Sequence, residues 1–580
     1  MKKVLAIALS VILILAATCI TAFAAGSGYP RVVVDGKEVT FSTELGYPYI
    51  NADGRVMIPL RAAAYALGLS DSEVIWDQAS KTASFSHGNT VVSFTEGSKE
   101  CTVEKSGRHI KIQMDTTIEN IGGRLYAPIR YLAEGFGYTV SWASHSRTAS
   151  VSTKVLGEVS VTGGKIAGVP TSTAGVIVYK GVPYAAPPVG ENRWKAPQPV
   201  KPWNGTMVCD TFSAICPQST TAYGDYQREF YSDPYPEMSE DCLYLNIWKP
   251  EDTSGGKLPV MVYIHGGGNG SGWSYEKEFD GEGIASKGVI LVTINYRLGV
   301  FGFLAHPDLS REAGGSSGNY GLMDQIAALQ WVKDNISAFG GDPENVTVFG
   351  QSAGAMDITM LACSPKAKGL FSKAILQSGG FLNFMGGSMS LADAESLGVK
   401  MTTDLGKSIQ ELRKMDANEL YAATASGSYT GICIDGSVVT QSLEDCLKNG
   451  DYMDVQYMIG SNKDEFGGMF SAGTTTLGDR QLELGRRPVY AYLFTRFMPG
   501  VDDPNSTCYG AFHTAECWYI FQTLGRCWRP LTEDDYRFAD MMANYWTNFA
   551  KNGDPNGNGL PVWAPYTAEN KNIQILDIVD

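Results

Sequence analysis

The chain has 580 residues and a mass of 62.6 kDa, and 44% of its residues are hydrophobic. This length and composition predict a folded protein with more than one domain and exclude general disorder. Phosphate groups would repel a chain with a formal net charge of -15, so nucleic acid and anionic membrane surfaces are excluded as expected partners.

The start of the chain has the parts of a secretory signal peptide. A positively charged start at residues 1–3 precedes a mainly apolar run over residues 4–20, and the small residues Ala22 and Ala24 mark a cleavage site. We expect residues 1–25 to be removed, which makes the mature protein secreted or cell-surface associated, without an integral membrane span. Retention of the apolar run as an anchor is the alternative. Export would place the remaining cysteines where disulfides can form.

Residues 29–154 contain an internal repeat. Residues 54–61 (GRVMIPLR) align with residues 123–130 (GRLYAPIR), and each copy continues into an Ala-rich, helix-like stretch, a glycine, a tryptophan (Trp76 or Trp142) and an alternating strand. Two such copies predict a small α+β module that is separate from the rest of the chain.

The P-[LI]-R motif with its Ala-rich helix and tryptophan resembles the amine-oxidase N-terminal-like (stalk) domains of exported bacterial proteins. The resemblance implies a spacer or a module that contacts the cell wall or a glycan; a folding cap for the next domain is the alternative. The histidines of this segment are scattered, so we expect no copper site here in spite of the family name.

Residues 157–580 are predicted to form a second domain with a doubly wound α/β sheet. Residues 258–264 and 289–295 are continuous apolar runs, as in strands that are buried on both faces. Residues 321–337 carry a helical stripe of apolar side chains. Further strands are expected at 346–349, 374–377 and 455–459, and this alternation of strands and helices is typical of an α/β fold.

Ser352 is the candidate nucleophile. It lies in the sequence Gly-Gln-Ser-Ala-Gly at residues 350–354, between a β-branched strand and the start of a helix, a turn that exposes the serine hydroxyl at the edge of a sheet. A second Gly-x-Ser-x-Gly sequence at residues 314–318 has no strand before it, so we interpret it as a flexible loop.

A serine nucleophile needs a base, which is normally a histidine held by a carboxylate. In the α/β-hydrolase arrangement both partners follow the serine, with the acid before the histidine. Of the six histidines only His513 follows Ser352, so it is the predicted base. The acid is expected after the strand that ends near residue 460, where the residues alone do not separate Asp464 from Glu465.

The predicted oxyanion hole consists of three backbone amides. Gly266 and Gly267 follow the apolar strand at 258–264, and consecutive glycines let amides turn into a cavity without side chains in the way. Ala353, the residue after the nucleophile, supplies the third donor.

These motifs and their neighbours resemble the type-B carboxylesterases, the α/β-hydrolase family that includes the cholinesterases. The similarity covers SEDCLYLNIW, HGGG, NYRLGVFGFL, FGQSAGA, GSNKDEF and GAFHTAE. It implies that Glu465 is the acid of the triad, and that Cys216 and Cys242 form a disulfide. No family pairing is evident for Cys433, Cys446, Cys508, Cys517 or Cys527. The family usually has an acidic residue before the nucleophile where this chain has Gln351, which should disfavour cationic substrates and protonation of His513.

The sequence therefore predicts a secreted serine esterase that needs no metal or organic cofactor. Its partner is a small-molecule or plant-polymer-linked ester. Six aromatic residues near the site loops could stack on an aryl or hydroxycinnamoyl group, although aromatic residues more often belong to the core: Trp273, Tyr275, Phe279, Phe466, Phe470 and Trp518. A non-catalytic adhesion protein on the same scaffold is the alternative.

Overall fold

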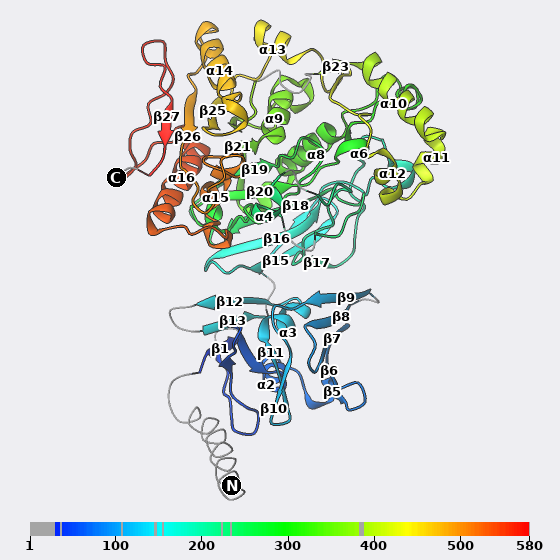
Figure 1. The fold of residues 1–580 in the computed structure, drawn as a ribbon, viewed down its shortest axis with the longest axis vertical. Helices are drawn as coiled ribbons and strands as arrows, with labels where there is room; N and C mark the ends of the chain where they lie inside the picture. The colour runs from blue at the N-terminus through cyan, green and yellow to red at the C-terminus, as the bar shows by residue number, and fades with distance from the viewer. Residues whose placement is uncertain are drawn as a thin grey trace, which may run out of the picture. The chain divides into compact units, whose positions relative to one another are not determined.

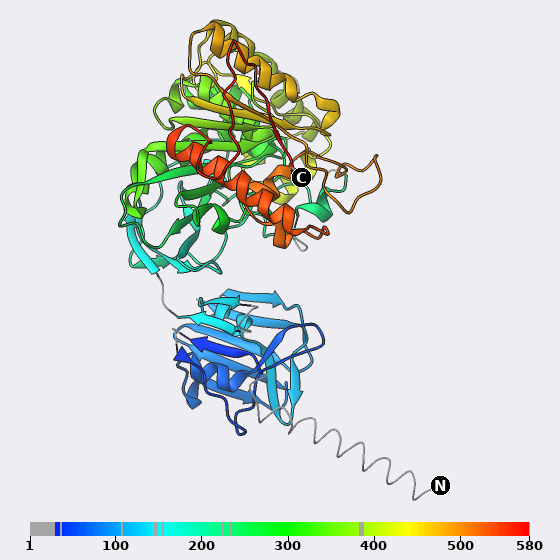
Figure 2. The ribbon, with the colours of Figure 1, turned by 90° about the vertical axis from the view of Figure 1, so that its left-hand side faces the viewer.

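The computed structural model describes residues 29–34, 37–105, 108–143, 148–153, 156–221, 224–231, 235–381 and 388–578. The predicted signal peptide lies outside these residues. The chain divides into two compact units, of which the first contains Met1–Leu156 and Val169–Ala174 and the second contains Gly157–Gly168 and Gly175–Asp580 (Figures 1 and 2). Among the described helices, none combines the length and the apolar character that a membrane span requires.

The two copies of the repeat pair with each other in the first unit. Strand β4 (Val56–Pro59) leads into helix α2 (Leu60–Ala66), and β11 (Arg124–Pro128) leads into α3 (Ile129–Gly135). β4 and β11 are antiparallel neighbours, with Ile58 opposite Ala127, and the two helices contact each other. Each copy of the predicted repeat thus forms a strand followed by a helix.

The first unit is mainly β-structure. One sheet has the order β10-β11-β4-β3, a second has β12-β13-β1-β2, and a five-stranded sheet runs from β5 to β9. Residues from both copies share one hydrophobic core. The strands are β1 (Arg31–Val34), β2 (Lys37–Glu38), β3 (Tyr49–Ile50), β5 (Val74–Asp77), β6 (Thr82–His87), β7 (Thr90–Thr95), β8 (Glu100–Lys105), β9 (Arg108–Gln113), β10 (Glu119–Ile121), β12 (Thr139–Ala143) and β13 (Thr148–Ser152).

A 12-stranded sheet organises the second unit, with the order β14-β15-β16-β18-β20-β19-β21-β22-β25-β26-β27 and β17 beside β15. Neighbours are antiparallel from β16 to β20 and parallel from β20 to β27. The strands are β14 (Leu156–Val161), β15 (Gly164–Pro170), β16 (Val176–Pro183), β17 (Thr206–Val208), β18 (Tyr244–Pro250), β19 (Leu258–Ile264), β20 (Ile290–Ile294), β21 (Gly341–Gln351), β22 (Lys373–Gln377), β25 (Gln456–Asn462), β26 (Tyr490–Phe494) and β27 (Gln574–Leu576).

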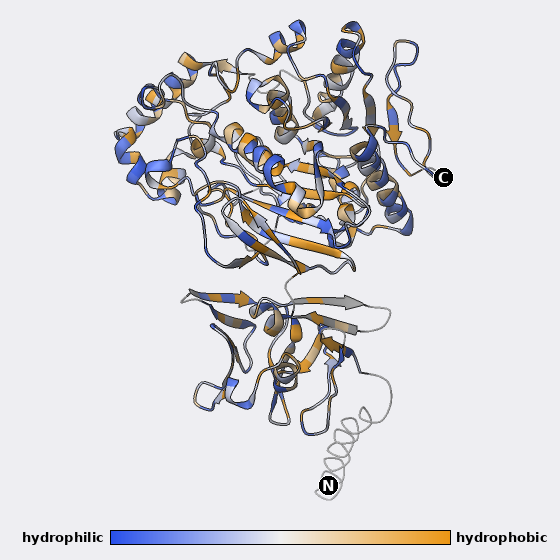
Figure 3. Cartoon of the chain, turned by 180° about the vertical axis from the view of Figure 1, so that it is seen from behind, coloured by the Kyte–Doolittle hydropathy of each residue, from blue (hydrophilic) through white to orange (hydrophobic). Residues whose placement is uncertain are grey.

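Helices cover this sheet, so its central strands are buried on both faces. Every residue of β20 is buried, and so is β19 from Val260 onward. Figure 3 shows apolar residues, in orange, along these central strands. Helices α8 (Tyr320–Asn335), α9 (Ala353–Cys363) and α16 (Glu533–Asn552) all contact β21. Strand β21, which leads to Ser352, is therefore covered by three helices.

Shorter elements surround the sheet. The helices are α4 (Tyr226–Glu229), α5 (Glu282–Ala285), α6 (Gly299–Phe303), α7 (Pro307–Ala313), α10 (Leu391–Leu405), α11 (Ile409–Lys414), α12 (Ala417–Thr424), α13 (Leu443–Asn449), α14 (Ser471–Glu483) and α15 (Ala515–Ile520), and β23 (Met389–Ser390) pairs with β24 (Cys433–Ile434). Residues 314–318, the second Gly-x-Ser-x-Gly sequence, form neither strand nor helix, as the sequence predicts.

Candidate active site

Ser352 lies at the sharp turn between β21 and α9. Its backbone has φ 56° and ψ -123°, a conformation that is strained for a residue with a side chain, and its N–H donates to the carbonyl of Gln377 on β22 at 2.8 Å. The side chain is partly exposed although the residues on both sides are buried. The turn thus presents the hydroxyl at the carboxyl edge of the parallel sheet.

The glycines on both sides of Ser352 are required by close backbone contacts. A Cβ atom at Gly350 would lie 2.6 Å from the carbonyl oxygen of Ile264, and one at Gly354 would lie 2.1 Å from the same oxygen. Strand β21 and helix α9 can therefore pass β19 at this distance only because both positions lack a side chain.

The predicted oxyanion loop lies directly against this turn. A Cβ atom at Gly266 would meet the carbonyl oxygen of Gln351 at 2.8 Å and the Cβ of Ser352 at 3.0 Å. Gly267 and Gly268 have φ 94° and 64° and are exposed, and a Cβ atom at Gly267 would lie 2.1 Å from the carbonyl oxygen of Ser271. The structure thus brings Gly266 and Gly267 beside Ser352 and Ala353, the first residue of α9.

A buried polar network holds the end of this loop. The Asn269 amide, at a residue with φ 58°, donates to Oδ1 of Asp357 at 2.9 Å, and Gln325 donates to Oδ2 at 2.5 Å. Tyr296 donates to Asn269 Oδ1 and to the carbonyl of His265. Burial raises the pKa of the Asp357 carboxyl to about 7, and this effect outweighs the hydrogen bonds from the two amides, which lower the pKa. The sequence carries only weak signals of this network, which are an acidic residue within the apolar helix α9 and an asparagine after three glycines.

His513 and Glu465 form a close pair. The imidazole Nδ1 lies 2.5 Å from Oε2 of Glu465, and Oε1 of that carboxylate accepts the N–H of Asn462 at 2.8 Å. Asp464 instead accepts the N–H of Ala511 at 2.8 Å, which ties down the loop before His513. The two carboxylates that the residues alone could not separate thus have different contacts, and Glu465 is the one at the imidazole.

The other imidazole nitrogen faces the elbow through Gln351. The amide nitrogen of this residue lies 3.1 Å from Nε2 of His513. In the described part of the chain, the side-chain hydrogen bonds of His513 go to Glu465 and Gln351. None of them goes to the hydroxyl of Ser352, which follows Gln351 in the chain. The imidazole therefore reaches the elbow, with the amide of Gln351 at the nitrogen that a base would use.

Two neighbouring titratable groups have strongly shifted pKa values. Burial lowers the pKa of His265 to about 4, so this imidazole is neutral under ordinary conditions. Burial, with a smaller effect from the charge of Glu465, raises the pKa of Glu516 to about 7. Glu516 accepts hydrogen bonds from the amides of Asn462 and Gln377 at 2.5 and 3.2 Å, beneath the acid of the pair.

The six aromatic residues named from the sequence differ in their surroundings. Trp273, Phe279, Phe470 and Trp518 are buried. Tyr275 stacks on Phe212 with ring centroids 4.3 Å apart and donates to the carbonyl of Ser213, so it is engaged elsewhere. Phe466 is 46% exposed and contacts His513.

The cysteines of the described chain are all free thiols. The thiols of Cys216 and Cys242 are nevertheless close together, since the Cys216 thiol is the first cause, ahead of burial, of the raised pKa of Cys242. The predicted pair is thus brought together in reduced form. Cys363 and Cys446 are a second close pair of thiols, which the sequence did not indicate.

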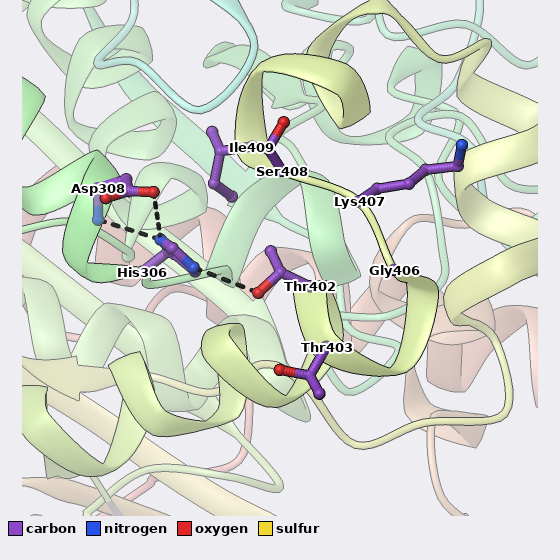
Figure 4. Close-up of a pocket in the computed structure, with 8 residues that line it drawn as sticks. All are labelled: His306, Asp308, Thr402, Thr403, Gly406, Lys407, Ser408 and Ile409. Carbon is purple, nitrogen blue, oxygen red and sulfur yellow. Dashed lines mark hydrogen bonds and ion pairs between the residues drawn. The ribbon is translucent and has the colours of Figure 1, made fainter.

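A polar pocket of about 340 Å³ is lined by other residues than Ser352, Glu465 and His513. His306, Asp308, Thr402, Thr403, Gly406, Lys407, Ser408 and Ile409 line it (Figure 4). His306 accepts the N–H of Asp308 and lies 3.4 Å from the hydroxyl of Thr402, so its ring nitrogens are occupied locally. Among the described residues, no three His, Cys, Asp or Glu side chains form a group that could hold a metal.

Comparisons with known proteins identify the families of both units. Residues 155–483 and 469–578 match the model of the carboxylesterase family, and residues 33–151 match that of the copper amine oxidase N-terminal domain. The chain is 40% identical over 457 residues to fumonisin B1 esterase of Sphingopyxis macrogoltabida, covering 67% of this chain and 81% of that protein. It is 35% identical over 473 residues to para-nitrobenzyl esterase of Bacillus subtilis (strain 168), covering 71% and 93%.

Solved structures that are similar to this chain are also esterases. A structure of PNB esterase is 30% identical, with a TM-score of 0.63, and the match covers 72% of this chain and 95% of that one. A thermophilic PNB esterase is 32% identical, with a TM-score of 0.62 over 72% and 96% of the two chains. The predicted fold is therefore confirmed.

Proposed function

The chain belongs to the carboxylesterase family and is a carboxylic ester hydrolase, and we propose that it works through an acyl-enzyme formed on Ser352. The observation that supports this most directly is the 2.5 Å contact between Glu465 and Nδ1 of His513. A carboxylate at Nδ1 holds the proton on that nitrogen and leaves Nε2 free to accept one.

In the proposed reaction, His513 takes the proton of the Ser352 hydroxyl as the oxygen attacks the ester carbonyl. The amide of Gln351 must first yield its place at Nε2, because the neutral imidazole has one acceptor. The tetrahedral oxyanion is held by the amides of Gly266, Gly267 and Ala353, where each donor contributes on the order of 3 kcal/mol. The imidazolium then protonates the leaving alcohol, and water releases the acyl group by the same steps.

The proposed substrates are aryl or hydroxycinnamoyl esters, either small molecules or esters linked to plant polymers. The similar proteins are named for substrates as different as fumonisin B1 and para-nitrobenzyl esters. An exposed phenylalanine beside the imidazole supports an aromatic group. Turnover of methyl ferulate, compared with that of short p-nitrophenyl esters, tests this; absence of ferulate cleavage removes the hydroxycinnamoyl proposal.

We also propose that the mature protein is secreted or attached to the cell surface. The support is the sequence of residues 1–25. In that setting the neighbouring thiols of Cys216 and Cys242 would form a disulfide, and the first unit would act as a spacer or as a contact to cell wall or glycan. Mass spectrometry of the protein from culture medium, before and after reduction, tests both cleavage and the disulfide.

The decisive experiment on the reaction is hydrolysis of p-nitrophenyl acetate by the mature protein and by Ser352→Ala. We expect a loss of kcat on the order of 10⁴-fold or more, because the nucleophile is removed. Ser316→Ala is the matched control, since it changes the serine of the other Gly-x-Ser-x-Gly sequence. A wild-type protein without turnover would favour a non-catalytic adhesion protein on this scaffold.

A further inference from the structure

Phe466 differs from the other aromatic residues around the site in its exposure. With 46% of its surface exposed it presents a ring to solvent, whereas Phe470, four residues later, is 4% exposed. Phe466 follows the acid Glu465 directly, on the short 3₁₀ turn Phe466–Gly468, and Phe470 lies just before the first residue of α14. Single exposed apolar side chains are common on protein surfaces, and what distinguishes Phe466 is that its exposed ring also contacts the imidazole of His513.

The backbone at Phe466 is strained. Its φ is 41°, in the left-handed region, and Gly467 and Gly468 follow with φ 67° and 80°. A residue with a Cβ atom loses roughly 1 to 2 kcal/mol in that conformation, which a glycine would not. Cβ atoms at both glycines would meet nothing within 4 Å, so the turn projects into open space. Strain of this kind is retained most often where it has a functional role.

Phe466 reaches the imidazole from its open side. Its ring lies 5.0 Å from that of His513 at an interplanar angle of 74°, while Phe470 lies flat against His513 at 5.2 Å and 16°. The two phenyl rings are 5.7 Å apart in an edge arrangement. Phe470 is therefore the buried support of the imidazole, and Phe466 is an outer, partly exposed wall beside it.

We propose that Phe466 is a specificity-determining residue, whose free ring packs against an aromatic group of the ester substrate next to the catalytic imidazole. This rests on the proposed function, since it needs an ester bound at Ser352. Aromatic pairs prefer edge-to-face or offset arrangements at 4.5 to 7 Å, a range that Phe466 already uses with its two neighbours. The backbone strain at position 466 arises because a phenylalanine, and not a glycine, adopts a positive φ there.

The experiment compares the full-length wild type with Phe466→Leu, Phe466→Ala and Phe466→Gly on three esters. Methyl ferulate has an aromatic acyl group, p-nitrophenyl acetate has an aromatic alcohol, and ethyl butyrate has neither. We expect kcat/KM to fall roughly 5- to 10-fold for the ester whose ring meets Phe466, mainly through KM, with less than a twofold change for ethyl butyrate. The ester whose kcat/KM falls shows whether Phe466 contacts the acyl group or the alcohol group of the substrate.

Thermal unfolding supplies a second readout. Phe466→Gly removes the positive-φ strain and should raise Tm relative to Phe466→Ala, which keeps it, while both lose aromatic selectivity. Phe497→Ala is the matched control, because Phe497 is 44% exposed and its ring contacts Tyr509 rather than His513. It should leave the ratio of the three activities unchanged.

An equal fall in kcat for all three esters would overturn the proposal, because it would mean that Phe466 only positions the imidazole. Unchanged selectivity in all three variants would overturn it as well. Failure of the proposed function is a different result: wild-type protein without turnover, or Ser352→Ala with full turnover.

Discussion

The amide of Gln351 occupies the acceptor nitrogen of His513 at 3.1 Å, where a carboxylate at the same position would face it with a negative charge. The amide tethers the imidazole to the turn at Ser352. At the scale of single residues, the partner of this nitrogen is therefore an uncharged group.

Gln351→Glu should therefore move the acid limb of the pH profile of kcat/KM to higher pH. The added carboxylate stabilises the imidazolium, so more base is protonated at a given pH, with a shift of roughly one unit. The measurement is kcat/KM for p-nitrophenyl acetate between pH 5 and pH 9. Gln351→Leu, which removes the amide without adding charge, is the control and should show no upward shift; equal profiles for the two variants would contradict the argument.

At the scale of elements, the oxyanion loop depends on helix α9 through the contact between Asn269 and Asp357. Asp357 is fully buried, and both of its oxygens accept amide protons, from Asn269 and from Gln325 on α8. The loop and the nucleophile are thus held by the same helix, since α9 begins directly after Ser352. The relative position of the serine and its oxyanion donors follows from this shared support.

Asp357→Asn should lower kcat by roughly 10-fold or more with little change in KM, because a misplaced loop removes stabilisation of the oxyanion only in the transition state. The asparagine has one acceptor oxygen where two amides need one each. A double-mutant cycle with Asn269→Ala isolates the contact: we expect the two losses to be strongly non-additive. Additive losses would show that Asp357 acts on catalysis by another route.

The elements around the site show what sequence patterns can and cannot predict. The strand expected at 258–264 is β19 to the residue, because it is a short continuous apolar run, and the helix expected at 321–337 is α8, because its apolar residues recur at helical spacing. The elbow was predictable because Gly350 and Gly354 are imposed by backbone contacts. β18 and α16 were not predicted as elements, and β21 begins at Gly341, before its β-branched residues.

The chemistry of the site was predictable where chain order restricts it and not where long-range contacts decide it. His513 is the one histidine after Ser352, so order alone selects it. The pairing of Asn269 with Asp357, 88 residues apart, leaves no local pattern. The positive φ of Phe466 is equally invisible, because a phenylalanine does not signal a left-handed conformation as a glycine does.

At the scale of the whole molecule, buried carboxyl groups make stability depend on pH. Glu276 and Glu278 lie against each other in the interior; burial raises the pKa of Glu276 to about 8 and that of Glu278 well above its ordinary value. A raised pKa means that the folded state prefers the protonated form. This contribution to stability is complete below the ordinary carboxyl pKa and is lost as pH rises through the raised values.

The free energy of unfolding should consequently fall between pH 5 and pH 8, and Glu278→Gln should make this fall shallower, since glutamine does not ionise. Urea unfolding at the two pH values measures the difference. Glu344→Gln is the control, because Glu344 is exposed and pairs with Lys333 at the surface. A Glu278→Gln protein with the same pH dependence as wild type would contradict the argument.

The two units have separate cores, which allows a test of what the first unit contributes. A chain that begins at residue 155 should keep the wild-type kcat/KM for p-nitrophenyl acetate within about twofold, since every site residue described lies in the second unit and domains of this size carry their own core. Calorimetry of the full chain should show an additional transition that the shortened chain lacks. A shortened chain that does not fold would identify the first unit as a folding cap.

Strand β1 is the first element of the N-terminal unit, yet it pairs in parallel with β13, the last, so that Arg31 stands opposite Thr148. A nascent chain therefore cannot close this unit until nearly all of its sequence has left the ribosome. At synthesis rates of roughly 5 to 20 residues per second, the leading strand waits several seconds for its neighbour. The arrival of β13, the last strand of the unit, therefore completes its fold.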